Sequence, residues 1–137
     1  MSYALTLTTP CPFDRVIPLL LFLTLALIPT FSCDYSYADE GDQYLTDGQY
    51  EYAIRLYDLA IGDKPDHAHS YNNRGIAYSS LGKYEQAIAD YGEAIRLNPE
   101  DADAYNNRGA AYNALGKSRE AELDFAKAKE LGMEETP

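Results

Sequence analysis

The chain has 137 residues, enough for about one domain, and its 22 acidic side chains outweigh 11 basic ones to give a formal net charge of −11. This balance argues against a nucleic-acid binder, which needs Lys and Arg to displace counterions from phosphates, and against adhesion to anionic lipid headgroups. We therefore expect protein or peptide partners that are not strongly acidic.

The first 33 residues differ in kind from the rest. An uncharged run, VIPLLLFLTLALI, covers 16–28. It suits a secretory signal, whose apolar stretch needs about 7–15 residues, whereas a membrane-spanning helix needs about 20. Thr30 and Ser32 are small residues at the first and third places before a cleavage point, and cleavage after Ser32 leaves Cys33 as the first residue.

Three interpretations of this segment stay open. It is a cleaved signal peptide, with Cys33 either free or lipidated in a placement that resembles a bacterial lipoprotein; or it is a retained anchor, with membrane attachment through residues 16–33; or the start codon is misassigned. The first two place the remaining residues outside the cytoplasm, in a periplasmic, extracellular or membrane-attached position of the cell envelope.

Beyond this segment the sequence repeats every 34 residues. The letters YNNRG occur at 71–75 and again at 105–109, and LGK occurs at 81–83 and 115–117. One step back, the segment 34–67 fits the same frame with aromatic, small and proline residues in register. These positions include Tyr37, Tyr71 and Tyr105; Gly41, Gly75 and Gly109; Ala53, Ala87 and Ala121; Tyr57, Tyr91 and Phe125; Pro65 and Pro99.

This pattern resembles the tetratricopeptide repeat family, in which an aromatic residue, Gly, Tyr, Ala, a second aromatic, Ala and Pro stand at fixed offsets. The resemblance implies an all-α fold, an α-solenoid of three tandem helix-turn-helix hairpins after the N-terminal hydrophobic segment. The repeat domain then covers 34–135, in units of 34–67, 68–101 and 102–135, and leaves a tail at 136–137.

Local signals agree with this fold. Apolar residues fall three and four apart within each unit, as they do on one face of a helix. Gly48, Gly82 and Gly116 interrupt that pattern where a helix C-cap is needed. Lys64 and Asn98 precede prolines, which disfavour a helical residue before them. We expect six helices, near 35–47, 50–62, 68–81, 84–97, 102–115 and 118–131.

In the tetratricopeptide repeat family, the first helix of each hairpin lines a concave groove that holds a peptide. Carried over by register, the resemblance implies a peptide-binding groove formed by Tyr35, Ala38, Asp39, Asp42, His69, Asn72, Asn73, Ile76, Asp103, Asn106, Asn107 and Ala110. Asn73 and Asn107 are in register and resemble the asparagine ladder of longer superhelices, although solvated polar residues are an equally good account. Family members that bind a C-terminal carboxylate use Lys, Arg and Asn where this chain has Ala38, Asp42 and Asp103.

A second pair of positions suggests an ion pair inside each hairpin. Arg74 and Arg108 are in register, as are Asp90 and Asp124. The first unit has neither partner, because Glu40 and Leu56 occupy those places. We expect an Arg–Asp pair between the two helices of the second and third hairpins, with independent surface charges as the alternative.

Chemistry of other kinds has little support in the sequence. His67 and His69 are two residues apart, the wrong spacing for one helical face, and neither cysteine is near, so no metal site and no cofactor are expected. There is no phosphate-binding glycine loop and no nucleophile–histidine motif. The chain is therefore not expected to be an enzyme.

The predicted function is a protein–protein interaction module, exported or membrane-attached. Two alternatives remain: a homo-oligomeric structural or scaffold unit, and a regulatory subunit of an envelope enzyme or assembly. The last helix, KSREAELDFAKAKEL at 117–131, is polar enough to cap the solenoid. Otherwise its outer face is a surface for self-association.

Overall fold

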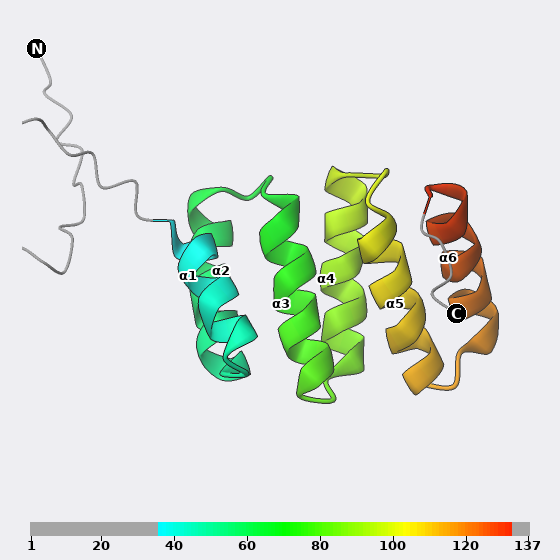
Figure 1. Cartoon of the computed structure of the whole chain (residues 1–137), viewed down its shortest axis with the longest axis horizontal. Helices are drawn as coiled ribbons and strands as arrows, with labels where there is room; N and C mark the ends of the chain where they lie inside the picture. The colour runs from blue at the N-terminus through cyan, green and yellow to red at the C-terminus, as the bar shows by residue number, and fades with distance from the viewer. Residues whose placement is uncertain (1–35, 133–137) are drawn as a thin grey trace, which may run out of the picture. The chain divides into compact units, whose positions relative to one another are not determined.

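The computed structural model describes residues 36–132, which form six helices and no strand (Figure 1). They are α1 (Tyr37–Thr46), α2 (Tyr50–Asp63), α3 (Ala68–Ser80), α4 (Tyr84–Leu97), α5 (Ala102–Ala114) and α6 (Ser118–Glu130). The expected all-α solenoid of three hairpins is confirmed, with helix ends within two residues of those predicted. No helix in this range is both long and apolar enough to cross a membrane. The signal-like segment, Cys33 and Tyr35 lie outside the described residues.

Each hairpin turns at a glycine in the left-handed conformation. Gly82 has φ of +72°, and Gly48 and Gly116 both have φ of +73°, a region that residues with a Cβ rarely adopt. The N–H of the next residue then reaches back to an orphan carbonyl of the preceding helix, as from Lys83 N to Tyr78 O at 2.9 Å. The predicted glycine C-caps are therefore confirmed.

The connections between hairpins use proline instead. Lys64 and Asn98 end α2 and α4 with φ of −134° and ψ of 86° and 89°, the extended backbone that a following proline favours. After the second connection α5 is capped at its start, because the Asp101 carboxylate accepts a bond from Ala104 N at 3.1 Å; α3 has no such side-chain cap. Sharp turns of both kinds keep consecutive helices antiparallel and adjacent.

The core lies between hairpins as much as within them. Tyr57 of α2 packs with Ala53 and with Ala77 of α3, which belongs to the next hairpin. Tyr91 of α4 repeats this arrangement with Ala87 and Ala111 of α5. Because each hairpin completes the core of its neighbour, the stack is stable only as a unit. All of these contacts and caps lie inside 36–132, so this part carries its own core.

The odd-numbered helices lie on the inner side of the stack. Within the described range α1 contacts α3 and α3 contacts α5, whereas α2 does not contact α4 and α4 does not contact α6. Helices that approach their counterparts in the next hairpin line the concave side of a curved array, and those that diverge line the convex side. We call the surface formed by α1, α3 and α5 the inner face.

Candidate functional site

The predicted groove residues differ in how much surface they offer on the inner face. Ala38, at 5% exposure, and Asn72, at 9%, are buried, and Ala38 therefore has little surface for a ligand. The other predicted groove residues within 36–132 are exposed or half-buried: Asp39, Asp42, His69, Asn73, Ile76, Asp103, Asn106, Asn107 and Ala110. The structure thus places most of the predicted positions at the surface of three neighbouring helices.

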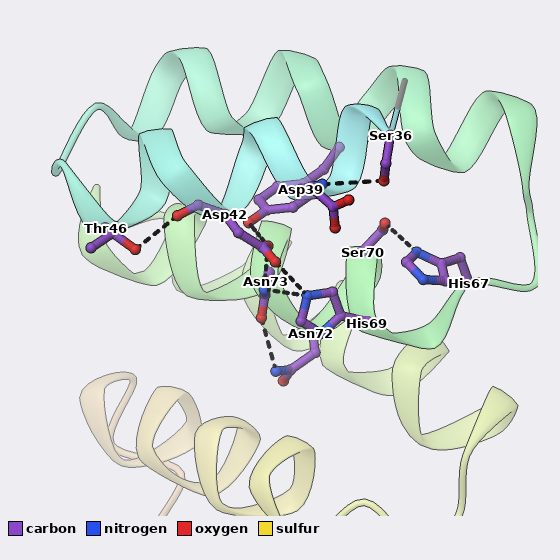
Figure 2. Close-up of polar contacts among 10 residues, drawn as sticks. Ser36, Asp39, Asp42, Thr46, His67, His69, Ser70, Asn72 and Asn73 are labelled. Atoms are coloured by element: carbon purple, nitrogen blue, oxygen red, sulfur yellow. Dashed lines mark hydrogen bonds and ion pairs between the residues drawn. The ribbon is translucent and has the colours of Figure 1, made fainter. Parts of the chain in front are cut away.

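Asp42 is the centre of a polar cluster between α1 and α3 (Figure 2). Its Oδ1 accepts hydrogen bonds from Tyr57 Oη at 2.7 Å and Asn73 Nδ2 at 2.8 Å. Its Oδ2 lies 2.9 Å from His69 Nε2. We call Asp42, Tyr57, His69 and Asn73 the Asp42 cluster; it joins α1, α2 and α3 at the inner face.

The geometry of the Asp42 cluster fixes the direction of its hydrogen bonds. His69 Nε2 lies 2.9 Å from a carboxylate oxygen and therefore carries a proton that it donates. Asn73 Nδ2 lies 3.0 Å from the same nitrogen. A protonated Nε2 cannot accept a bond from Asn73, so the Asn73 amide donates to Asp42 instead.

Electrostatics hold Asp42 in its ionised form. Burial alone favours the neutral acid, but the hydrogen bonds from His69, Tyr57 and Asn73 outweigh it and lower the pKa of Asp42. The same contact acts oppositely on the phenol: burial, and then the bond to the Asp42 carboxylate, raise the pKa of Tyr57. Tyr57 therefore remains a donor and has no role as a base.

A second set of contacts continues the network from α3 to α5. Asn72 Nδ2 approaches Asn73 Oδ1 at 3.4 Å, and Asn107 Nδ2 approaches Asn72 Oδ1 at 3.3 Å. Asn73 donates one amide hydrogen to Asp42 and its carbonyl oxygen accepts from Asn72, whereas Asn107 donates one amide hydrogen to Asn72 and keeps its carbonyl oxygen, with the other hydrogen, for another partner. The two asparagines of the predicted ladder are therefore not equivalent.

The Asp42 cluster was not predicted from the sequence. Asp42 has Ile76 and Ala110 at its equivalent positions, and His69 has Asp103 in the third hairpin, so neither residue follows the repeat. A usable signal existed in the spacing, because the cross-helix contacts of the inner face join residues 27, 31 and 35 apart. Polar residues separated by about one repeat length are candidates for such contacts.

The arginines of α3 and α5 are held in ion pairs. Arg74 Nε and Nη2 donate to Asp90 at 2.8 and 2.7 Å, and Arg108 repeats this with Asp124 at 2.7 and 2.8 Å. The bond to its aspartate raises the pKa of each arginine. The predicted Arg–Asp pairs are thus confirmed. Arg74 also bonds Asp58 of the preceding hairpin.

The described residues contain no group of three or more His, Cys, Asp or Glu side chains placed to hold a metal ion. His67, one of the two histidines considered for a metal, has its Nδ1 2.7 Å from the Ser70 hydroxyl. Ser70 is fully buried and is therefore not positioned as a nucleophile.

Comparison with known proteins identifies the repeats. A family model described as "TPR repeat" matches residues 77–116, and two described as "Tetratricopeptide repeat" match 56–89 and 102–131. No curated protein matches.

Solved structures match across the described range. A structure described as "Second TPR of Spaghetti (RPAP3) bound to HSP90 peptide SRMEEVD" is 36% identical, with a TM-score of 0.69, covering 70% of this chain and 89% of that one. The second TPR domain of human RPAP3, in complex with HSP70 peptide SGPTIEEVD, is also 36% identical, with a TM-score of 0.69 and coverages of 71% and 81%. The Arabidopsis OM64 TPR domain is 29% identical, with a TM-score of 0.69 and coverages of 70% and 79%.

Proposed function

This chain belongs to the tetratricopeptide repeat family, and from that premise we propose that its inner face binds an extended segment of another protein. Membership supports a protein-interaction module in general terms. Which surface binds, and what it binds, are inferred from the described side chains.

The observation that carries the proposal is the unused hydrogen-bonding capacity of α5. Asn107 retains a donor and an acceptor on one amide, the combination needed to pair with a peptide unit. Ile76 on α3 is a half-buried apolar residue, and Ala110 on α5 is exposed. Side-chain amides can hydrogen-bond a peptide backbone, and small apolar surfaces beside them can contact the side chains of the peptide. Binding sites typically combine apolar surface with a few polar groups in this way.

The α1–α3 half of the inner face has a different role in this proposal. There the Asp42 cluster uses its hydrogen bonds within the protein, so it fixes the spacing of α1 and α3. The ligand then contacts α3 and α5 directly and meets the first hairpin at Asp39, whose exposed carboxylate has no bond within 36–132.

The experiment is affinity capture on immobilised residues 34–137 with identification of bound proteins by mass spectrometry. Asn107→Ala removes the free amide, and Gln86→Ala removes an exposed amide from α4 as the matched control. The proposal requires a partner that Asn107→Ala loses and Gln86→Ala keeps. A partner retained equally by both variants would place binding elsewhere.

We further propose that the domain acts outside the cytoplasm or on a membrane face, as a binding module or as the regulatory subunit of an envelope assembly. The support is the apolar run at 16–28 with Cys33 after it. Mass spectrometry of the N-terminus of the full chain, produced in cells, separates the cases. A chain that starts at Cys33, with or without lipid, shows cleavage, and an intact chain in the membrane fraction shows a retained anchor.

Self-association is a second candidate, and an exposed apolar stripe favours it. Tyr52 is 53% exposed and Leu59 is 50% exposed, on one side of α2 with Leu56 between them. The equivalent positions of α4 are Gln86, Asp90 and Glu93, all polar. On α6, by contrast, Glu122 and Lys129 replace Ile88 and Ile95 of α4. The last helix exposes one large apolar residue, Leu123, at 66%, whereas α2 exposes two. We therefore infer α2 as the surface, and sedimentation of Leu59→Glu tests it: a self-associating chain becomes monomeric.

A further inference from the structure

We propose that the inner face selects protein segments that carry Lys or Arg, opposite in charge to the EEVD ends of the peptides bound in the RPAP3 structures. This inference rests on the proposed function. It specifies the chemistry of the ligand that the inner face accepts.

The inner face carries more acidic than basic side chains. The helices α1, α3 and α5 contribute three acidic side chains to it, Asp39, Asp42 and Asp103. Their sequences contain no lysine, and their arginines are Arg74 and Arg108 alone. An acidic segment laid along this face would therefore meet carboxylates of the same sign.

Both arginines of these helices are already held in ion pairs. Each guanidinium donates two bonds to one aspartate, and that aspartate is buried, with 8% of its side chain exposed. Turning either arginine toward a ligand would leave a buried carboxylate without its partner, which is strongly unfavourable. The inner face therefore has no arginine or lysine to offer to the carboxylates of an acidic tail.

Two carboxylates of the inner face are available to a ligand. Asp39 and Asp103 are exposed, and neither has a side-chain hydrogen bond or ion pair within 36–132. Asp103 lies one helical turn before Asn107 on α5, so both side chains lie on the same face. A peptide unit held by Asn107 brings a neighbouring Lys or Arg side chain within reach of Asp103.

Apolar surface beside these groups suits the stem of a cationic side chain. Lys and Arg lay their methylene groups on apolar surface while the charged end stays in water. Ala110 follows Asn107 by three residues on α5, and Ile76 is the equivalent residue on α3. With neighbouring helices roughly 10 Å apart, Asp39 and Asp103 lie about 20 Å apart, or about six extended residues.

The test uses three immobilised libraries of nine-residue peptides, identical except for two fixed positions occupied by Lys, Glu or Ser. Residues 34–137 are applied to each library at low and high salt. The expected result is binding to the Lys library at least about tenfold stronger than to the Glu library, with the difference shrinking as salt screens the charges. Asp103→Asn should reduce this ratio about threefold to fivefold, as for one exposed ion pair.

The matched control is Glu85→Gln, which removes the same charge from an exposed position on α4. If Glu85→Gln reduces the ratio as much as Asp103→Asn, the net charge of the chain explains the preference and the inference is wrong. Equal binding to all three libraries overturns the charge preference and leaves the proposed peptide-binding function standing. No binding to any library counts against both.

Discussion

Gly75 is the position where one methyl group tests the packing of the whole stack. A Cβ there would lie 2.7 Å from Cε1 and 2.9 Å from Cδ1 of the Tyr91 ring, far inside normal contact. Tyr91 is 2% exposed and packs with Ala87 and Ala111, so the ring has no free space to move into. Gly75→Ala must therefore displace the ring or separate α3 from α4.

The magnitude follows from two opposing effects. Overpacking of this kind costs about 1–3 kcal/mol, and replacing a mid-helix glycine by alanine recovers up to about 1 kcal/mol. We expect Gly75→Ala to lower the free energy of unfolding by about 1–2 kcal/mol. Gly92 is the matched control, because it lies inside α4 and its Cβ would meet only the Arg108 Nη1 atom, at 3.9 Å. Gly92→Ala should therefore gain stability.

The assay is urea unfolding of residues 34–137, followed by circular dichroism. The two alanine variants should differ by about 2 kcal/mol, and their melting temperatures by at least about 8 °C for a domain of this size. A third variant, Gly75→Ala with Tyr91→Leu, should show favourable coupling, since the smaller side chain makes room for the methyl group. The reasoning is refuted if Gly75→Ala is as stable as Gly92→Ala.

Three further predictions concern charge. Asp42 has a lower pKa in the folded than in the unfolded chain, so its stabilising contribution is present above about pH 4 and is lost as pH falls through the folded pKa. In Asp42→Asn the urea midpoint should therefore fall less between about pH 5 and pH 3 than in the unchanged chain. An equal fall in both would contradict this. Gly92→Asp places a carboxylate beside Arg108, in register with the contact between Asp58 and Arg74. It should raise the free energy of unfolding by about 0.5–1 kcal/mol in low salt and by less in 1 M salt. Arg74→Ala leaves the buried Asp90 without its partner and should lower the free energy of unfolding by about 3 kcal/mol. The Arg74→Ala/Asp90→Ala double variant should be no less stable than Arg74→Ala alone. Additive losses would show that the two side chains do not interact.

The repeat made most of the fold predictable. Helix ends follow from residues with one conformational requirement, such as Gly82 with its positive φ and Asn98 before proline. The Arg–Asp pairs were predictable for the same reason, since Arg74 and Asp90 recur together and are missing together in the first hairpin.

The polar contacts of the inner face were not predictable from the repeat, because they depend on residues that break it. Asp42 and His69 each occur in one hairpin only, and their contact joins two different hairpins. Periodicity assigns both residues to the inner face. It does not reveal that Asn73 is engaged by Asp42 while Asn107 is left available.

Because the inner helices are closer to one another than the outer helices, the stack resists bending differently in the two directions. Bending that draws the inner helices together meets resistance, because α1 already contacts α3 and α3 already contacts α5. Bending that straightens the stack stretches the contacts of Asp42 with His69 and of Asn72 with Asn107, while the outer helices α2 and α4 have no contact to break. The inner contacts therefore add to the packing of α2 on α3 and of α4 on α5 in opposing this bending, and a ligand bridging α3 and α5 would add to them.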